Sequence, residues 1–385
     1  MSLLKRVFAA LIAAVLTIPL FSAVSAQTQE QTSTPEVSAR AAVLIDADSG
    51  KILFAKQESL QLPMASTTKI MTALLALEQA EVKDPVVTVT DEMVRVEGSS
   101  MGLMPGNKLH LSDLAVGMLM VSGNDAANTA AIAMAGSAAK FAELMNARAQ
   151  EIGMKNTHFV TPSGLDSAMH YSTAYDMALL GAEALNNSRF AGIVSQKQMT
   201  VKFINPEQTI SYGNHNRLLS LYPDSIGIKT GFTKKAGRCL VSAAQRDGVR
   251  LVAVTLNAPN DWDDHSKLFN YGFAKLHSFT PDTAALRYTL PVVGGTAETV
   301  SIVPGTADSI SLTDDEIARM KQQVELPRFV YAPIREGEML GTVSYLLDGK
   351  VILEVPLLAE QVVECPQPQK TRMEKIWDRI KSIFQ

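Results

Sequence analysis

The chain has 385 residues, of which 46% are hydrophobic and 19% charged, and its formal net charge is −4. This composition excludes a disordered chain, and the weak negative charge excludes the broad basic surface that nucleic-acid binding needs. The length is sufficient for two domains. Two cysteines, Cys239 and Cys365, are too few for a disulfide framework, and Cys239 is expected to be a small buried strand residue.

The N-terminal segment is predicted to be a secretory signal peptide. Lys5 and Arg6 form a short positive region before the almost wholly apolar residues 7–21. Small residues at 24–26 (VSA) then offer a signal-peptidase site, so residues 1–26 are expected to be removed. An uncleaved membrane helix is the alternative, but the apolar run is shorter than the roughly 20 residues that span a bilayer. The mature protein is therefore expected to be extracytoplasmic.

A polar segment, 27–37, is predicted to be a flexible linker, and a first domain is expected over 38–278. Two β-prone runs, 42–45 and 52–54, are separated by a turn signal and predict a hairpin. Apolar periodicity then predicts helices from Ile70 onward, over 114–121 with Ser112 as its N-cap, and over 124–135, 138–152 and 175–185.

Three later strands are expected at 226–231, 239–244 and 250–256. Strands at both ends of the domain with helices between them predict an α+β fold. In this fold helices flank an antiparallel sheet, and a mainly helical lobe is inserted between the early and late strands.

The chain changes character after about residue 279, where a small separate all-β domain is predicted over 279–364. Its strands are expected at 288–293, 299–303, 339–347 and 351–355. Asp348-Gly349 is a strong hairpin turn between the last two of these strands. This domain carries no evident catalytic constellation.

The last segment, 365–385, is predicted to be an amphipathic helix that binds a membrane surface. Thr371 and Glu374 have the spacing of a capping box. Five basic and two acidic residues give this tail a net charge of +3, whereas the rest of the mature chain is acidic. The apolar face consists of Met373, Ile376, Trp377, Ile380, Ile383 and Phe384. A helix packed on the protein's own surface is the alternative.

Three short motifs occur in order along the chain: Ser66-x-x-Lys69, Ser122-x-Asn124 and Lys229-Thr230-Gly231. The first is weak evidence by itself, because Ser137 and Lys140 share its pattern, and Ser137 is interpreted there as a helix N-cap. Ser66 differs because an extended segment ends at it and a helix begins directly after it. Backbone N–H groups at a helix N-terminus favour developing negative charge.

These residue types suit nucleophilic catalysis. A serine hydroxyl is a poor nucleophile until a base accepts its proton, and Lys69 lies one helical turn after Ser66, within reach of its Oγ atom. A lysine acts as a base only when burial or a nearby positive charge lowers its pKa, and Lys229 is the expected second charge. Ser122 is expected to relay a proton, and Asn124 to fix either the substrate or Lys69.

The set S-x-x-K, S-x-N and K-T-G is the signature of penicillin-binding proteins and serine β-lactamases. The sequence resembles most closely the low-molecular-mass D-alanyl-D-alanine carboxypeptidases, over nearly the whole mature chain. The resemblance includes Pro63-Met64-Ala65-Ser66, Ser122-Gly123-Asn124-Asp125-Ala126, Pro162-Ser163-Gly164-Leu165, His170-Tyr171-Ser172-Thr173-Ala174 and Lys229-Thr230-Gly231-Phe232-Thr233. It implies a β-lactamase/DD-peptidase-like catalytic domain followed by a small C-terminal β-domain.

The resemblance implies a two-step acyl transfer, without a metal or cofactor, on peptidoglycan stem peptides that end in D-Ala-D-Ala. Ser66 would attack the carbonyl between the two D-alanines with Lys69 as general base, and Ser122 would pass a proton to the leaving D-alanine. β-Lactam antibiotics are expected to acylate Ser66 as covalent inhibitors. The C-terminal helix would hold the exported protein on the outer face of the bacterial cytoplasmic membrane.

The remaining site residues are expected to bind the substrate. Asn124 would bind the peptide backbone, the strand that contains Gly231 would present Lys229, Thr230 and Thr233 to the terminal carboxylate, and the backbone N–H groups of Ser66 and Phe232 would form the oxyanion hole. Some relatives carry His at the position of Phe232. A backbone donor is insensitive to that difference, whereas side-chain contacts with the substrate are not.

Four other functions are weighed against this one. A β-lactamase of the commonest class adds a deacylating glutamate in an E-x-x-L-N pattern, where this chain has Ala182. A non-catalytic penicillin-sensing or peptidoglycan-binding module would not need the intact Ser66 and Lys69 pair. A DD-endopeptidase would use the same residues and stays open. A zinc peptidase is not expected, because the six histidines form no H-x-H or H-E-x-x-H arrangement.

Overall fold

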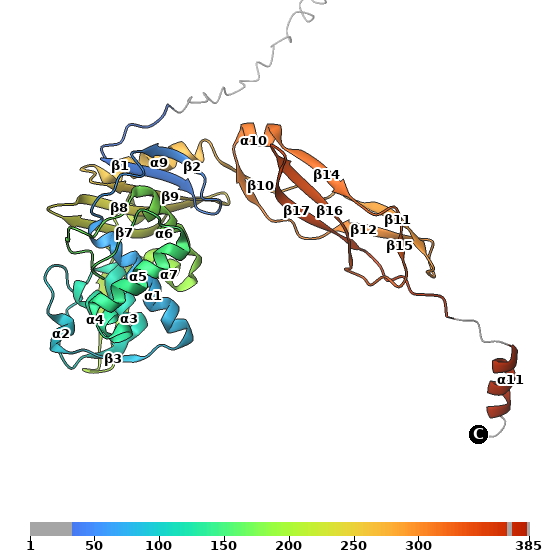
Figure 1. Ribbon diagram of the computed structural model, residues 1–385, viewed down its shortest axis with the longest axis horizontal. Helices are drawn as coiled ribbons and strands as arrows, with labels where there is room; N and C mark the ends of the chain where they lie inside the picture. The colour runs from blue at the N-terminus through green and yellow to red at the C-terminus, as the bar shows by residue number, and fades with distance from the viewer. Residues whose placement is uncertain (1–32, 368–371, 383–385) are drawn as a thin grey trace, which may run out of the picture. The chain divides into compact units, whose positions relative to one another are not determined.

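The computed structural model describes residues 33–367 and 372–382 (Figure 1). The predicted signal peptide and most of the predicted linker lie outside these residues. The folded part begins at Val37, which is 8% exposed and is the last residue of the predicted linker.

The first domain is built around a five-stranded antiparallel sheet in the order β2-β1-β9-β8-β7 (Figure 1). Its strands are β1 (Ala41–Asp46), β2 (Ile52–Lys56), β7 (Ser225–Thr233), β8 (Gly237–Arg246) and β9 (Val249–Leu256). The predicted hairpin and the three predicted late strands are confirmed. Because β7 lies at an edge, one side of this strand is open to the rest of the domain.

Each face of the sheet packs on a separate apolar core, because successive side chains of a strand point to opposite faces. On β1, Val43 and Ile45 belong to the core that contains α6 (Ala174–Asn186), whereas Ala42 and Leu44 belong to the core that contains α9 (Asp261–Phe273). The sequence did not predict α9. Cys239 is buried on β8, as expected.

The helical lobe consists of seven helices within the described residues. These are η1 (Ala65–Thr68), α1 (Lys69–Val82), α2 (Asp91–Val94), α3 (Leu111–Met120), α4 (Asn124–Ala135), α5 (Ala138–Ile152) and α7 (Ser188–Val194), and α8 (Leu218–Leu221) follows further along the chain. Two small hairpins, β3 (Val86–Thr88) with β4 (Lys108–His110) and β5 (Gln198–Phe203) with β6 (Gln208–Gly213), accompany them. Helices α4 and α5 have the predicted bounds, and Gly136 ends α4 at φ 80°.

The predicted N-cap of α3 was wrong. His110 occupies that position, and its backbone N–H donates to Asp113 Oδ2 at 3.2 Å. Ser112 lies inside the first turn, where its hydroxyl donates to Asp84 Oδ2 at 2.7 Å. A serine two residues further along was mistaken for the cap because histidine is a less usual residue at this position.

The C-terminal domain contains a six-stranded sheet in the order β14-β16-β17-β12-β11-β15. The strands are β11 (Tyr288–Val293), β12 (Thr299–Pro304), β14 (Lys321–Glu325), β15 (Val330–Tyr331), β16 (Met339–Leu347) and β17 (Lys350–Ala359). A separate pair, β10 (His277–Phe279) with β13 (Ile310–Leu312), and the short helix α10 (Asp314–Arg319) complete it. Asp348 and Gly349, with φ of 50° and 81°, form the predicted turn between β16 and β17.

The tail contains the predicted helix, α11 (Arg372–Lys381), whose Met373, Ile376 and Trp377 side chains are exposed. The predicted N-cap, Thr371, and the last apolar residues of the chain lie outside the described residues. Within residues 33–367 and 372–382, no helix has both the length and the apolar character needed to cross a membrane.

Candidate active site

The predicted nucleophile lies in a tight turn at the start of α1. Ser66 belongs to η1, a single 3₁₀ turn that runs directly into α1, and its side chain is partly exposed. Thr67 Oγ1 donates to the carbonyl oxygen of Met64 at 2.6 Å, which fixes the entry to this turn. Ala65, just before the serine, has φ 49°, so the backbone is left-handed at a residue that is not glycine.

Lys69 lies fully buried behind the serine. Its Nζ atom is 3.0 Å from Ser66 Oγ, 2.6 Å from Asn124 Oδ1 and 2.7 Å from the carbonyl oxygen of Ser163. Burial lowers the pKa of Lys69 well below its usual value, and the positive charge of Lys229 lowers it further, against a smaller opposing effect of Asp125. The expected reach between Lys69 and Ser66 is therefore present, and Ser163 is a partner that the sequence did not indicate.

Ser122 and Asn124 come from the junction between α3 and α4. Ser122 has φ 62° and is 6% exposed, and it lines the same cleft as Ser66. Asn124 Nδ2 donates to the carbonyl oxygen of Glu97 at 2.6 Å, while its Oδ1 accepts from Lys69. Of the two roles expected for Asn124, the structure shows the contact with Lys69.

Asp125 is a further site residue, which follows the S-x-N motif directly and for which no role was predicted. Its carboxylate accepts the backbone N–H groups of Met101, Gly102 and Leu103 at 2.8–3.0 Å. It thereby holds the segment that precedes β4 against the start of α4. Ser99, at the beginning of this segment, lines the cleft.

Strand β7 carries the K-T-G motif along the edge of the sheet. Lys229 is 1% exposed, its Nζ donates to the carbonyl oxygen of Thr230 at 2.9 Å, and burial lowers its pKa to about 7. A Cβ atom on Gly231 would lie 3.0 Å from the backbone nitrogens of Ser66 and Thr67. Glycine at this position therefore allows β7 to approach the nucleophile turn closely.

The other two predicted residues of β7 differ in their surroundings. The Phe232 side chain is 65% exposed and lines the cleft. Thr233 Oγ1 donates to Asp166 Oδ1 at 3.0 Å and accepts the N–H of Ala236 at 3.0 Å, and it is not among the residues that line the cleft. The Thr233 hydroxyl is thus engaged by the protein itself.

The cleft has a volume of about 300 Å³ and brings residues of all three motifs together. Ser66, Ser122, Thr230, Gly231 and Phe232 line it, with Ser99, His215, Arg238, Asp261 and Trp262. The last five were missed: Arg238, Asp261 and Trp262 come together only when α9 packs beside β8, and Ser99 and His215 lie in loops outside the three motifs. Arg238 donates to Asp261 at 2.7 and 3.0 Å and lies 5.4 Å from the Trp262 ring centre, which places a cation and an aromatic ring at the cleft.

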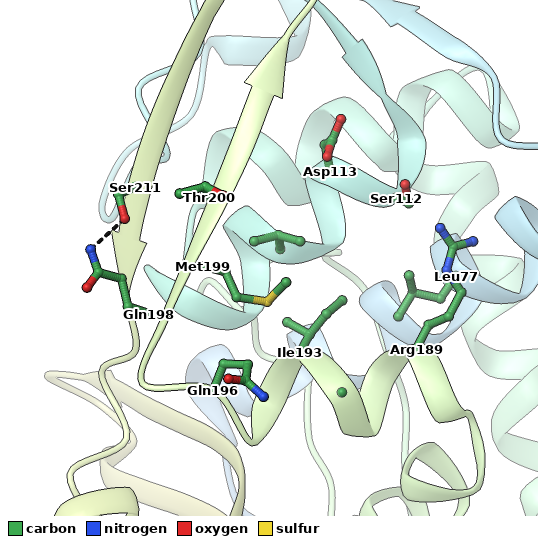
Figure 2. Close-up of a pocket in the computed structure, with 12 residues that line it drawn as sticks. Leu77, Ser112, Asp113, Arg189, Ile193, Gln196, Gln198, Met199, Thr200 and Ser211 are labelled. Atoms are coloured by element: carbon green, nitrogen blue, oxygen red, sulfur yellow. Dashed lines mark hydrogen bonds between the residues drawn. The ribbon is translucent and has the colours of Figure 1, made fainter.

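A second cavity, of about 820 Å³, lies elsewhere in the domain, and Figure 2 shows its lining. Leu77, Ile193 and Met199 give it an apolar floor, and Asp113 and Arg189 are its charged residues. Its lining contains no lysine beside a serine. The smaller cleft is therefore the candidate active site, because it has the nucleophile and the base.

The serine that shares the S-x-x-K pattern has no such surroundings. Ser137 Oγ accepts the backbone N–H of Lys140 at 3.2 Å and caps α5, as predicted. Among the residues that the structure describes, no group of three or more His, Cys, Asp or Glu side chains could hold a metal ion.

Comparisons with known proteins agree with this geometry. A family model described as D-alanyl-D-alanine carboxypeptidase matches residues 27–260, and one for the C-terminal domain of penicillin-binding protein 5 matches residues 277–365. The chain belongs to the D-alanyl-D-alanine carboxypeptidase family. The resemblance drawn from the motifs is confirmed, and the chain is an enzyme of this type.

Individual relatives support the same assignment. The D-alanyl-D-alanine carboxypeptidase DacF of Bacillus subtilis is 30% identical over 93% of this chain and 94% of its own length. A D-alanyl-D-alanine endopeptidase of Pseudomonas aeruginosa is 34% identical over 62% of this chain and 79% of its own length. The solved structure of penicillin-binding protein 5 from Haemophilus influenzae is 30% identical, with a TM-score of 0.63 over 86% of this chain and 99% of that chain. The predicted fold class, with its C-terminal β-domain, is confirmed.

Proposed function

We propose that this chain removes the terminal D-alanine from peptidoglycan stem peptides through an acyl-enzyme on Ser66. One observation carries the proposal: the amine of Lys69 lies 3.0 Å from Ser66 Oγ, in a fully buried position. Burial and the charge of Lys229 lower the pKa of Lys69, which increases the fraction of uncharged amine. An uncharged amine has the lone pair that a general base needs.

The surroundings of Lys69 support this role by their geometry. An uncharged amine has two N–H bonds and one lone pair, arranged tetrahedrally with the Cε–Nζ bond. The two N–H groups donate hydrogen bonds to Asn124 Oδ1 and to the carbonyl oxygen of Ser163. The lone pair then points at Ser66 Oγ and accepts its proton.

The reaction follows from this arrangement. As the Ser66 proton moves to Lys69, Oγ bonds to the carbonyl carbon between the two D-alanines, and the oxyanion accepts hydrogen bonds from the backbone N–H groups of Ser66 and Phe232. The C–N bond then breaks, and the leaving D-alanine nitrogen takes a proton through Ser122. Water then attacks the acyl carbon and gives a proton to Lys69, the bond between the acyl carbon and Ser66 Oγ breaks, and Lys69 returns the proton to Oγ as the shortened peptide leaves.

The terminal carboxylate of the substrate is assigned to Lys229 and Thr230, with Thr233 as a third donor. Burial lowers the pKa of Lys229 to about 7. A carboxylate beside it would favour its charged form and raise that pKa. For Thr233 to take part, its hydroxyl must turn away from Asp166, to which it donates here.

Two assays on the purified protein test the proposal. A fluorescent penicillin should label the wild type covalently, and Ser66→Ala should lose this labelling. A pentapeptide ending in D-Ala-D-Ala should release free D-alanine, with a loss of about a thousandfold or more in Ser66→Ala. Undiminished labelling of Ser66→Ala would contradict the mechanism. If no free D-alanine is released and only cross-linked peptides are cut, the endopeptidase alternative, supported by the relative of that name, replaces the carboxypeptidase.

We also propose that the protein is exported by residues 1–26 and held on the outer face of the cytoplasmic membrane by its C-terminal helix. Support comes from α11, where the apolar Met373, Ile376 and Trp377 are 51–69% exposed and the basic Arg372 and Lys375 are exposed too. Deletion of residues 370–385 should release the enzyme into the soluble fraction with its penicillin labelling unchanged. Retention of the truncated enzyme on membranes would contradict the anchor.

A further inference from the structure

A buried imidazole outside the three motifs bonds to segments on both sides of the catalytic pair. His170 is 3% exposed, and its Nδ1 accepts the backbone N–H of Val160 at 2.9 Å, while its Nε2 lies 2.8 Å from Thr68 Oγ1. A backbone N–H can only donate, so Nδ1 carries no proton and the ring proton is on Nε2. The imidazole therefore donates to the Thr68 hydroxyl. Burial, with a smaller effect of His158, lowers the pKa of His170 to about 4, so the ring is neutral near pH 7.

The Thr68 end of this arrangement supports the nucleophile turn. Because the Thr68 oxygen accepts from His170, its own proton is free to be donated to the carbonyl oxygen of Ala65, 2.8 Å away. Ala65 is the left-handed residue that precedes Ser66. Gly164 packs on the same carbonyl, since a Cβ atom there would lie 1.9 Å from the Ala65 oxygen. The direction in which Ser66 leaves Ala65 is thus fixed by this hydrogen bond and this close contact.

The Val160 end supports the base. Val160 begins the segment in which the carbonyl oxygen of Pro162 accepts from Thr72 Oγ1 at 2.6 Å and that of Ser163 accepts from Lys69 Nζ at 2.7 Å. The Ser163 carbonyl is one of the two acceptors that direct the lone pair of Lys69. His170 therefore connects the turn that presents Ser66 with the segment that orients Lys69.

We propose that His170 is a positioning residue for acylation, which acts through Thr68 and the 160–164 segment to set the geometry between Ser66 and Lys69. The inference rests on the proposed function, because it takes these two residues as the reacting pair. Without the ring nitrogens, the Val160 N–H loses its acceptor and the Thr68 hydroxyl loses the donor that orients it. The turn and the segment then move independently, and an error of a few tenths of an ångström in the Ser66–Lys69 contact slows the reaction.

The first test compares the rate of labelling with the fraction finally labelled, using a fluorescent penicillin on the full-length protein. His170→Phe should acylate about tenfold to a hundredfold more slowly, while the fraction labelled at completion stays at the wild-type level. On a D-Ala-D-Ala peptide, kcat should fall with little change in KM. His170→Gln, which keeps a donor near Thr68, should recover part of the rate.

His265→Phe is the matched control. His265 is also fully buried and contacts two hydroxyls, those of Ser242 and Thr255, but it lies on α9. The His265→Phe substitution should lower the free energy of unfolding and leave the acylation rate per folded molecule unchanged. An acylation rate of His170→Phe equal to the wild-type rate would overturn the inference. The inference would also be overturned if the labelled fraction of His170→Phe fell in parallel with its acylation rate. An equal slowing of acylation in His265→Phe would overturn it too.

Two variants of Thr68 test the same proposal if His170→Phe does not fold. Thr68→Ser retains the hydroxyl and should acylate within a few-fold of wild type, whereas Thr68→Val, of nearly the same volume, should be slowed like His170→Phe. A fast Thr68→Val would overturn the inference. If the wild type itself is not labelled, the proposed function fails; if the wild type is labelled and these variants match it, only the role of His170 fails.

Discussion

Ala65 and Ser122 share a backbone conformation that residues other than glycine rarely adopt, with φ of 49° and 62°. Each left-handed residue of this kind costs about 1–3 kcal/mol and persists only where the surrounding structure enforces it. Both belong to segments that shape the cleft: Ala65 precedes Ser66, and Ser122 lines the cleft itself. The surrounding structure therefore enforces two unfavourable backbone conformations beside the cleft that Ser66 and Ser122 line.

Lys69 and Lys140 stand in the same S-x-x-K pattern, so substitutions of the two lysines test which serine is the nucleophile. Lys69→Ala should reduce penicillin acylation by about a thousandfold or more, because no other amine lies within hydrogen-bonding distance of Ser66 among the described residues. Lys140→Ala should acylate at the wild-type rate, since the Lys140 contact with Ser137 is a backbone cap. Rates of labelling by a fluorescent penicillin measure both. A slow Lys140→Ala with a fast Lys69→Ala would show that the wrong serine was chosen.

The side chains in the three motifs could be predicted from the sequence, because each motif lies at the boundary of a predicted element. Ser163 and His170 could not. The group on Ser163 that contacts Lys69 is a backbone carbonyl, which no residue type reveals, and the imidazole meets Thr68 across 102 positions of the chain. Both lie in motifs that the family resemblance includes, but only the fold places them beside Lys69 and Thr68.

At the scale of elements, the sheet and the helical lobe meet beside the cleft at the contact between β7 and η1. Gly231→Ala would place a Cβ atom 3.0 Å from the backbone nitrogens of Ser66 and Thr67. Backbone atoms do not turn aside as a side chain does, so β7 and η1 must separate by a few tenths of an ångström. Acylation should fall about tenfold to a hundredfold with little loss of stability.

Gly192→Ala is the control for this substitution. Gly192 lies within α7, and an added Cβ atom there meets nothing within 4 Å. Alanine should therefore raise the melting temperature slightly through its better helix propensity and leave acylation unchanged. Equal acylation rates in Gly231→Ala and Gly192→Ala would show that the close approach of β7 is not needed.

Helices α4 and α5 were predicted to the residue because glycine and serine separate two strongly apolar or amphipathic runs. Helix α9 was missed because its buried face contains Asp261, Asp264 and His265, each at most 2% exposed. Buried polar residues on a helix remove the apolar periodicity on which prediction depends. Their partners come from different parts of the chain, namely Ser38 before β1, Arg238 and Ser242 on β8 and Thr255 on β9, and only the fold brings them together.

At the scale of the whole molecule, the buried histidines should make the protein less stable in acid. Burial lowers the pKa of His265 from 6.5 to about 3 in the folded chain, so below pH 6.5 the unfolded chain binds a proton that the folded chain does not. The free energy of unfolding should then decrease as the pH falls, by up to about 1.4 kcal/mol per pH unit for this residue. Burial raises the pKa values of Asp46, Asp113 and Asp261, which act in the opposite sense nearer pH 4.

A comparison with His265→Asn isolates this contribution. Urea unfolding of both proteins at pH 6.5 and at about pH 4.5 should show a smaller loss of stability in the variant, because Asn does not titrate. The carboxyl contributions are common to both proteins and cancel in the difference. The same pH dependence in the two proteins would show that His265 takes up its proton at a similar pH in the folded and unfolded chains.

The position of β7 at the sheet edge bears on the substrate selectivity of the enzyme. Its outer row of amide and carbonyl groups has no neighbouring strand within residues 33–367 and 372–382. An extended peptide that lies along such a row completes the sheet for the duration of one turnover, through main-chain contacts that ignore side-chain identity. Under the proposed function, tolerance of varied stem peptides would come from these main-chain contacts, and discrimination would come from the chain end, where the free carboxylate would meet Lys229.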